Sequence, residues 1–271
     1  VAYLMEVDAL AQTAYDIDFA LPDSPPAPSV QATALADQVI LVWGAEPESY
    51  AATSEVDVDA AGNPTTFLFE GYNVYQAETN SGAGKRKRLA TYDLVNGITE
   101  IYDDVFNAEL GETINIRTQF GSDSGLEHYH SITGDGLNNN SKLITNREYY
   151  FAVTAYGHNA DGIPRTLESS STYLSVRPEV PNTYSAGENT ASAGDSFTAA
   201  HAGPSQGSVD VVVINPADLT GDNYTLTFDD AMPDGTVATN WTITNDTSGE
   251  VLVSNNPVVG GVNTATGVEV G

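Results

Sequence analysis

The sequence predicts an all-β protein of the β-sandwich type. Short apolar runs, several of which alternate with polar residues, recur along the 271 residues and are separated by turn-forming stretches. The chain contains 24 Gly and 13 Pro, and its 14 tyrosines outnumber its 8 phenylalanines. This composition favours strands and tight turns over helices. At roughly 150 residues per domain, the length predicts two domains.

The first 28 residues are expected to form an N-terminal segment followed by a proline-rich linker. Residues 1–20 leave two alternatives open, because a helical stripe runs from Leu4 to Ala14 and a strand-like alternation from Tyr3 to Val7. Residues 22–28 contain four prolines and are expected to be extended and stiff.

Residues 29–178 are predicted to form the first β domain. Its expected strands are residues 39–43, 69–75, 89–92, 98–102, 149–156 and 170–176. Residues 107–146 interrupt the domain, and a structureless loop of about 40 residues is uncommon inside a compact domain. We therefore expect this insertion to carry an additional hairpin, with residues 113–119 as one of its strands.

Residues 179–203 are rich in Ser, Ala, Gly and Asn and are predicted to be a linker. A second β-sandwich-like module is expected over residues 204–271. Its predicted strands are residues 209–214, 224–228, 241–244 and 250–253, with turns at 221–223, 234–235 and 248–249. Four short strands are few for a sandwich, so this module is expected to be incomplete.

The order of motifs in residues 25–178 resembles that of a fibronectin type III domain. A proline-rich entry precedes a strand that ends in Trp43, then Gly71-Tyr72-Asn73-Val74-Tyr75, then a strand that carries Tyr149. The resemblance implies a fibronectin type III/Ig-like β-sandwich with a long insertion. It also implies that Trp43 is a buried core aromatic and that Tyr149 lies near the tyrosine corner, where the hydroxyl binds backbone.

A second likeness extends over most of the chain. Phe69 to Tyr75, Tyr149 to Tyr156, Thr166-Leu167-Glu168 and Leu219 to Phe228 follow one another as in large secreted bacterial proteins that usually end in a type IX secretion sorting domain. This resemblance implies an extracellular or cell-surface location. The chain opens on Val1 without a recognisable signal peptide and lacks a sorting domain, so we expect it to be a processed or truncated piece of a longer protein.

The charge balance argues against several classes of partner. There are 9 Lys and Arg against 37 Asp and Glu, which gives a net charge of −28 that repels nucleic acids and anionic membranes. A solvated acidic surface and an affinity for divalent cations are both compatible with it. The basic run Lys85-Arg86-Lys87-Arg88 could hold an acidic partner, or it could be an exposed turn. No apolar stretch reaches the roughly 18 residues that a membrane span requires, so membrane insertion is not expected.

Calcium is the cofactor that the acidic turns suggest, because Ca²⁺ prefers several oxygen ligands supplied by short loops. The candidate ligands are Asp57, Asp59, Asp103, Asp104, Asp218 and Asp222. None of them fits the Asp-x-Asp-x-Asp-Gly pattern of a calcium loop, and acidic turns without a metal are the alternative. His128 and His130 would share one face of a strand and could hold a metal with Glu127 or Asp123 nearby, or could be surface histidines of a loop.

The sequence does not indicate an enzyme. It contains no cysteine, which removes thiolate nucleophiles and disulfides, and it has no Gly-x-Ser-x-Gly motif. We expect a non-enzymatic extracellular structural or adhesive protein that is cell-surface or filament-forming and assembles by β-strand exchange, with residues 1–20 as the donated strand. Its expected partners are further copies of itself or other surface proteins. The alternative is an accessory carbohydrate- or protein-binding module of a larger secreted enzyme, with polysaccharide as the partner.

Overall fold

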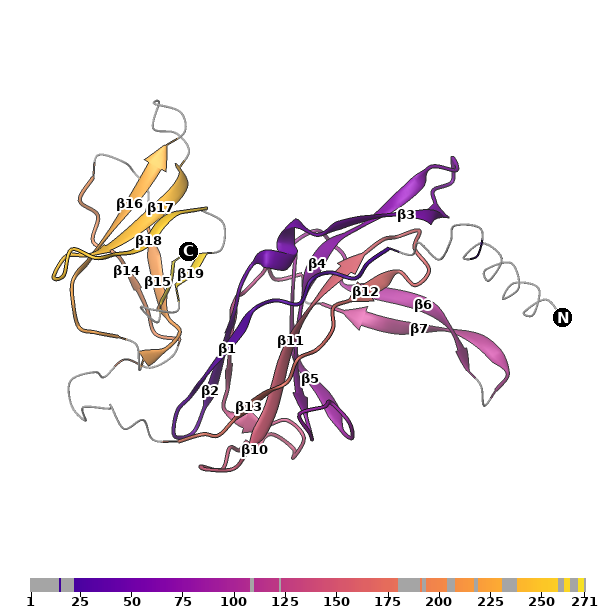
Figure 1. Cartoon of the computed structure of the whole chain (residues 1–271), viewed down its shortest axis with the longest axis horizontal. Helices are drawn as coiled ribbons and strands as arrows, with labels where there is room; N and C mark the ends of the chain where they lie inside the picture. The colour runs from indigo at the N-terminus through magenta and orange to yellow at the C-terminus, as the bar shows by residue number, and fades with distance from the viewer. Residues whose placement is uncertain are drawn as a thin grey trace. The chain divides into compact units, whose positions relative to one another are not determined.

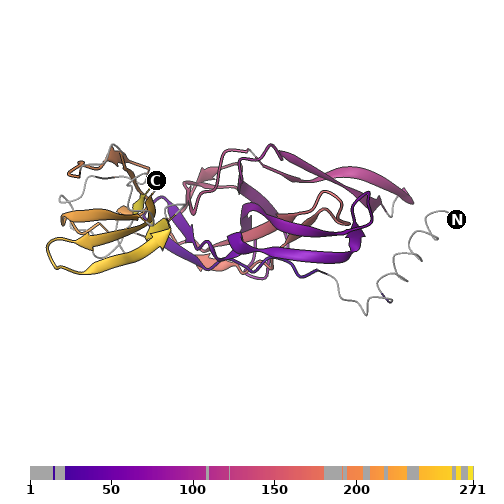
Figure 2. The same cartoon turned by 90° about the horizontal axis from the view of Figure 1, so that it is seen from above.

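The computed structural model is an all-β protein, as the sequence predicts, and antiparallel strand pairs build its sheets (Figures 1 and 2). The structure describes residues 15, 22–107, 110–121, 123–179, 191, 194–203, 208–216, 219–230, 238–257, 261–263 and 268–270. Among these residues, no helix is long and apolar enough to cross a membrane. The 3-10 helix η1 (Glu46–Ser49) lies between two strands.

The chain divides into two compact units, and it passes between them several times. Unit 1 comprises Val1–Ser29, Ala45–Leu126 and Phe151–Tyr173, and unit 2 comprises Val30–Gly44, Glu127–Tyr150 and Leu174–Gly271. Both units therefore hold parts of the predicted 29–178 domain. The predicted domain boundaries stay a prediction. The N-terminal strand or helix and most of the 179–203 linker lie outside the described residues.

Unit 1 is built around one long strand. Its main sheet has the order β12-β11-β4-β3, and β5 also pairs with β4. The strands are β3 (Ala51–Val58), β4 (Pro64–Ala77), β5 (Arg86–Asp93), β11 (Tyr149–His158) and β12 (Thr166–Glu168). The first part of β4 pairs with β3 and the second part with β5. At Gly71 a Cβ would lie 2.3 Å from the carbonyl oxygen of Tyr92, so this pairing requires glycine.

The apolar alternation of residues 149–156 places four side chains in the core. Tyr149, Phe151, Val153 and Ala155 are all buried, with at most 3% of each residue exposed. Ala152, Thr154 and Tyr156 on the opposite face are buried as well. The sequence alternation predicted that one face of β11 is buried, and the structure shows that its opposite face is buried as well.

The insertion does carry the expected hairpin. Strand β7 (Glu112–Phe120) contains the predicted residues 113–119 and pairs with β6 (Glu100–Asn107). The partner strand begins before the predicted insertion, so the hairpin is longer than the sequence indicated. These two strands form a two-stranded sheet that projects from the rest of unit 1 (Figure 1). We call the hairpin 100–120 the arm.

Unit 2 contains the sheet β1-β2-β8, formed by β1 (Val30–Ala34), β2 (Val39–Trp43) and β8 (Tyr129–Ile132). Strand β2 is buried throughout, and Trp43 is 2% exposed, as predicted. Three short strands also belong to this unit: β9 (Gly134–Asp135) and β10 (Ser141–Lys142), which pair with each other, and β13 (Leu174–Val176). The backbone N–H of Ile144 donates to the hydroxyl of Tyr149 at 2.9 Å, which is the backbone contact expected for that tyrosine.

The C-terminal part of unit 2 has two further sheets, with the orders β14-β15-β20-β19 and β16-β17-β18. Their strands are β14 (Ser196–Thr198), β15 (Asp210–Val213), β16 (Tyr224–Asp230), β17 (Ala238–Asn245), β18 (Val251–Pro257), β19 (Gly261–Asn263) and β20 (Val268–Val270). Strands β15 to β18 coincide with the four predicted strands. Trp241 and Ile243 form the apolar core here, and Tyr224 and Leu226 pack against them. The sequence missed β14, β19 and β20 because three-residue strands leave almost no periodic signal.

Candidate functional site

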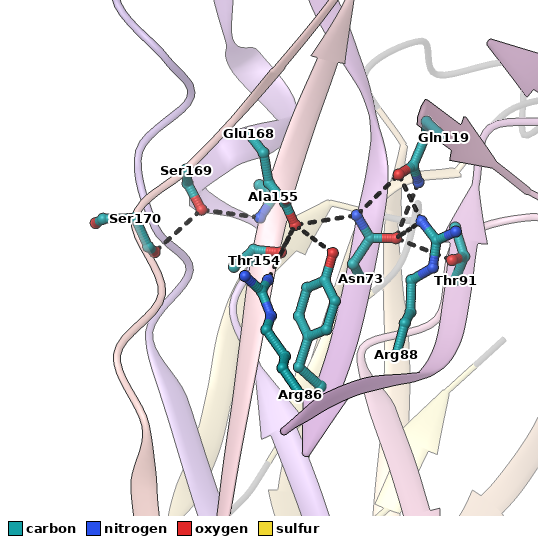
Figure 3. Close-up of polar contacts among 11 residues, drawn as sticks. Asn73, Arg86, Arg88, Thr91, Gln119, Thr154, Ala155, Glu168, Ser169 and Ser170 are labelled. Atoms are coloured by element: carbon teal, nitrogen blue, oxygen red, sulfur yellow. Dashed lines mark hydrogen bonds and ion pairs between the residues drawn. The ribbon is translucent and has the colours of Figure 1, made fainter. Parts of the chain in front are cut away.

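A polar network joins the main sheet of unit 1 to the arm (Figure 3). Its centre is Asn73 of β4, which is fully buried. The Oδ1 atom of Asn73 accepts hydrogen bonds from Arg88 Nη1 at 3.2 Å, Thr91 Oγ1 at 2.9 Å and Gln119 Nε2 at 2.9 Å. Its Nδ2 atom donates to Gln119 Oε1 at 3.3 Å and to Glu168 Oε1 at 3.1 Å. One amide thus holds β4, β5, β7 and β12 together.

Glu168 is the second centre of this network. Its Oε1 atom also accepts hydrogen bonds from the hydroxyls of Tyr75, at 2.8 Å, and Thr154, and Arg86 Nη2 lies 3.9 Å away. Burial and the negative charge of Glu168 raise the pKa of Tyr75, so its phenol stays a hydrogen-bond donor. The guanidinium of Arg86 stacks on the same tyrosine, 3.6 Å from the ring centroid.

The four basic residues 85–88, at the start of β5, have two different roles. Arg86 and Arg88 belong to the network: Arg86 pairs with Glu168, and Arg88 Nη1 donates to Gln119 Oε1 at 2.6 Å. Lys85 and Lys87 are exposed. Within the described part of the chain, neither lysine takes part in an ion pair. Arg86 and Arg88 thus help to hold the fold together, while Lys85, Lys87 and the 38% exposed side chain of Arg86 present positive charge at the surface.

The base of the arm is tightly held. Arg88 and Arg117 stack on the ring of Phe120, with their guanidinium carbons 3.8 and 4.8 Å from the ring centroid. On the other strand, the backbone N–H of Arg165 donates to Oδ1 of Asp103 at 2.7 Å, and Arg165 Nη1 donates to the carbonyl oxygen of Tyr102 at 2.8 Å. Cation–π contacts and charge-assisted hydrogen bonds fix the direction in which the arm leaves unit 1.

The distal part of the arm has only its own two strands. In the described residues, β6 and β7 pair with each other and with no third strand. Val105, Leu110 and Ile116 are exposed by 38%, 65% and 38%. A hairpin with two open edges and exposed apolar side chains is the geometry to which another β-strand adds. The arm is thus a candidate interaction surface.

Two of the calcium candidates bind the loop at residues 159–165. Oδ1 of Asp57 accepts a hydrogen bond from the backbone N–H of Ile163 at 3.0 Å, and its Oδ2 accepts one from Ser54 at 2.6 Å. Asp103 holds the backbone of Arg165 and accepts a hydrogen bond from Thr118 at 2.8 Å. Both carboxylates are 8% exposed, and protein donors occupy oxygens that a cation would need.

The other candidates are spread over the fold. Asp59 accepts hydrogen bonds from the backbone N–H groups of Ala61 and Asn63 and closes the β3–β4 turn. Asp104 binds Asn115 across the arm, and Asp222 binds Asn245 in unit 2. Asp218 lies outside the described residues. No three metal-ligand side chains converge anywhere in the part that the structure describes, so calcium binding by these residues stays a prediction.

The loops that flank the arm are tied by the carboxylates of Asp123 and Glu70. Oδ1 of Asp123 accepts hydrogen bonds from the backbone N–H groups of Asn96, at 2.7 Å, and Gly97, at 2.9 Å. Both carboxylate oxygens of Glu70 accept from Asn96 Nδ2. Burial is the main cause that raises the pKa of Glu70 to about 7. The hydrogen bond from Asn96 acts in the opposite direction, while the negative charges of Asp93 and Asp123 also raise this pKa. This carboxyl group therefore titrates near neutral pH.

The histidine pair does not present a metal site. His128 is buried, and His130 lies in β8 opposite Leu41 of β2. Burial lowers the pKa of His130 to about 4, so its imidazole is neutral at physiological pH. Burial raises the pKa of the neighbouring Glu127. His128 is buried just before β8 and His130 lies within it, so neither is a loop-surface histidine, and no three-ligand site occurs among the described residues.

Sequence reasoning missed the residues that form the polar network. One signal was present: Asn73 stands between the apolar residues Tyr72 and Val74, and a polar residue at such a position needs buried partners. Its partners Gln119 and Glu168 lie 46 and 95 positions away. No local pattern links residues at such separations, so only the fold identifies them.

Comparisons with known proteins found no matching family model, no matching curated protein and no matching solved structure.

Proposed function

We propose that this chain is a non-enzymatic structural or adhesive protein of the cell surface or extracellular medium, in which the arm joins copies of the chain into larger assemblies. The observation that carries the proposal is the combination of two open β edges with exposed apolar side chains on a rigidly anchored base. Two-stranded hairpins are at best marginally stable in water, and a third strand would stabilise this one. A second copy supplies such a strand in the form of its own arm.

The strand order supports a fibronectin type III-like assignment as part of this proposal. Strands β1, β2 and β8 form one sheet, while β5, β4, β11 and β12 lie in another. If β3, the arm and the two-residue strands β9 and β10 are left out and the others are lettered in chain order, β1, β2 and β8 correspond to strands A, B and E of Ig-like sandwiches, and β4, β11 and β12 to strands C, F and G. The contact between Ile144 and the hydroxyl of Tyr149 is of the tyrosine-corner kind. Such modules commonly occur in extracellular proteins that display loops or hairpins.

The test is the solution mass of the full chain, measured by light scattering on a sizing column at about 1 M salt. The Debye length is then about 3 Å, so contacts between surface charges are suppressed while apolar and β contacts persist. We expect the wild type to associate and Val105→Asn/Ile116→Asn to elute with the mass of one chain, because Asn is disfavoured in strands and removes the apolar contact.

Leu68→Asn/Val95→Asn is the matched control, since Leu68 and Val95 are exposed by 57% and 71% in unit 1 but lie outside the arm. We expect this control to associate as the wild type does. A wild type that stays monomeric at every concentration, or an arm variant that associates unchanged, would refute the proposal. A monomer that binds insoluble polysaccharide would instead favour an accessory carbohydrate-binding module.

A further inference from the structure

The loop between β5 and β6 contains the single Asn–Gly dipeptide of the sequence, Asn96-Gly97. At such a pair the backbone nitrogen of the glycine can attack the side-chain amide of the asparagine, because glycine has no side chain that hinders the approach. Both residues are exposed, and a Cβ on Gly97 would meet no atom within 4 Å. The dipeptide is therefore accessible to water.

Three groups contact this dipeptide in positions that suit the reaction. Oδ1 of Asp123 accepts the backbone N–H of Gly97 at 2.9 Å, so a carboxylate base touches the attacking nitrogen. The backbone N–H of Ile98 donates to Oδ1 of Asn96 at 2.9 Å, where negative charge would develop. The carboxyl oxygens of Glu70 lie 3.0 and 2.9 Å from Nδ2 of Asn96, which is the leaving nitrogen. A base, an oxyanion donor and a candidate acid thus surround one amide and its nucleophile.

The hydrogen bond from Ile98 also restricts the side chain of Asn96. A side-chain oxygen that accepts the N–H group two residues later closes an Asx turn, which folds the side chain back along its own backbone. The nitrogen of Gly97 belongs to the segment that this turn encloses. The turn removes rotations that would otherwise be lost when this nitrogen bonds to Cγ of Asn96, and so it lowers the entropic cost of ring closure.

Glu70 can supply the proton that the leaving nitrogen needs. The residue is 4% exposed, and burial raises its pKa to about 7, so a large fraction is protonated at neutral pH. The hydrogen bond from Asn96 opposes this shift, and the negative charges of Asp93 and Asp123 support it. Burial also raises the pKa of Tyr156, so this nearby phenol stays neutral. A carboxylic acid with a pKa near the working pH is an efficient general acid.

We propose that Asn96 and Gly97 form a self-processing site, at which the side-chain amide of Asn96 is lost as ammonia and a succinimide ring forms. The nitrogen of Gly97 bonds to Cγ of Asn96 and gives its proton to Asp123. The electron pair of the carbonyl double bond moves to Oδ1, where the N–H of Ile98 stabilises it. The electron pair then returns, the bond from Cγ to Nδ2 breaks, and Nδ2 leaves as ammonia with the proton of Glu70. Solvent carries the proton on Asp123 back to Glu70.

Hydrolysis of the succinimide changes the loop permanently. Water opens the ring at either of its carbonyl carbons and leaves an aspartate or an isoaspartate at position 96. Either product places a new carboxylate where the amide of Asn96 donated to Glu70. Two carboxylates in contact repel each other, so the loop that leads into the arm is released from β4. The chemistry is independent of the proposed function, since it requires only this chain and water.

The test follows Asn96 in the full chain by mass spectrometry. Trypsin cleaves after Arg88 and Arg117, so residues 89–117 form the peptide to be measured, and fragmentation distinguishes position 96 from Asn107 and Asn115. The same chain unfolded in concentrated urea gives the reference rate. At about pH 6, we expect the folded chain to lose ammonia from Asn96 at least about tenfold faster than the unfolded chain.

The two states should also differ in the sign of their pH dependence. The folded rate should fall as the pH rises through about 7, because Glu70 then loses the proton that the leaving nitrogen takes. The rate of the unfolded chain should rise with pH, because hydroxide removes the proton of the attacking nitrogen there.

Glu70→Gln and Asp123→Asn should each slow the conversion of the folded chain at least about tenfold, because they remove the acid and the base. Glu55→Gln and Asp161→Asn are the matched controls, since they change exposed carboxylates elsewhere in unit 1, and they should convert as the wild type does. Circular dichroism first establishes that each variant is folded.

A folded chain that converts no faster than the unfolded chain would overturn the proposal. So would a folded rate that rises with pH through 7, or a Glu70 or Asp123 variant that converts at the wild-type rate. None of these results bears on the assembly through the arm, which is measured as a solution mass.

Discussion

Replacement of Asn73 by alanine should destabilise unit 1 more than its small size suggests. The side chain is fully buried and forms five hydrogen bonds to groups on β5, β7 and β12. Arg88 keeps an acceptor on Gln119 and Glu168 keeps two other donors, but Thr91 Oγ1 and Gln119 Nε2 lose the acceptor that they share. An unsatisfied buried polar group costs roughly 1–3 kcal/mol, so we expect a loss of about 3 kcal/mol in total.

The assay for Asn73→Ala is urea unfolding followed by near-ultraviolet circular dichroism. Both tryptophans, Trp43 and Trp241, belong to unit 2, so tyrosine signals and hydrogen exchange in β4 and β5 must report on unit 1. Asn115→Ala is the control, since Asn115 is exposed in unit 1, where its side chain donates a hydrogen bond to Asp104, and the change should cost within about 0.5 kcal/mol. A loss below about 1 kcal/mol for Asn73→Ala would refute the view that this amide organises the network.

Two further predictions concern the carboxyl groups. The pKa of Glu70 is raised to about 7, so the protonated form of Glu70 favours the folded state. The folded protein should therefore lose stability as the pH rises from about 4.5 through 7. In melting curves, Glu70→Gln should flatten this pH dependence. If both proteins show the same pH profile, burial does not control this carboxyl. Asp57→Ala should lower the melting temperature by the same amount in calcium and in chelator, because the carboxylate oxygens of Asp57 accept hydrogen bonds from Ile163 and Ser54. A difference that depends on calcium would show that Asp57 binds the metal instead.

Much of the fold follows from local patterns, because alternation and turn residues are local properties. Residues 149–156 alternate over a buried face, and Gly221 and Gly249 adopt positive φ where turns were expected. The hairpin in the insertion was predicted because a long structureless loop is improbable in a compact domain. Its partner strand was not identified, since Glu100 to Asn107 shows no clean alternation of apolar and polar residues and only its first part lies in the strand predicted at residues 98–102.

The site was less predictable, and the reason is the sequence separation of its parts. Acidic residues that stand together, such as Asp103 and Asp104, suggest a shared ligand, yet the first binds the backbone of Arg165 and the second binds Asn115. Carboxylates in turns look alike in a sequence whether they bind a cation, an amide or water. Only the three-dimensional arrangement shows which donor each of them meets.

The acidic residues of this chain also stabilise its loops. The chain has no cysteine, and several of its loops are fastened by carboxylates that accept backbone N–H groups: Asp57 holds Ile163, Asp103 holds Arg165, and Asp123 holds Asn96 and Gly97. Charge-assisted bonds of this kind are about twice as strong as neutral ones. Buried pairs are screened little by salt, whereas contacts of exposed lysines are screened strongly. High salt should therefore leave these buried loop contacts in place.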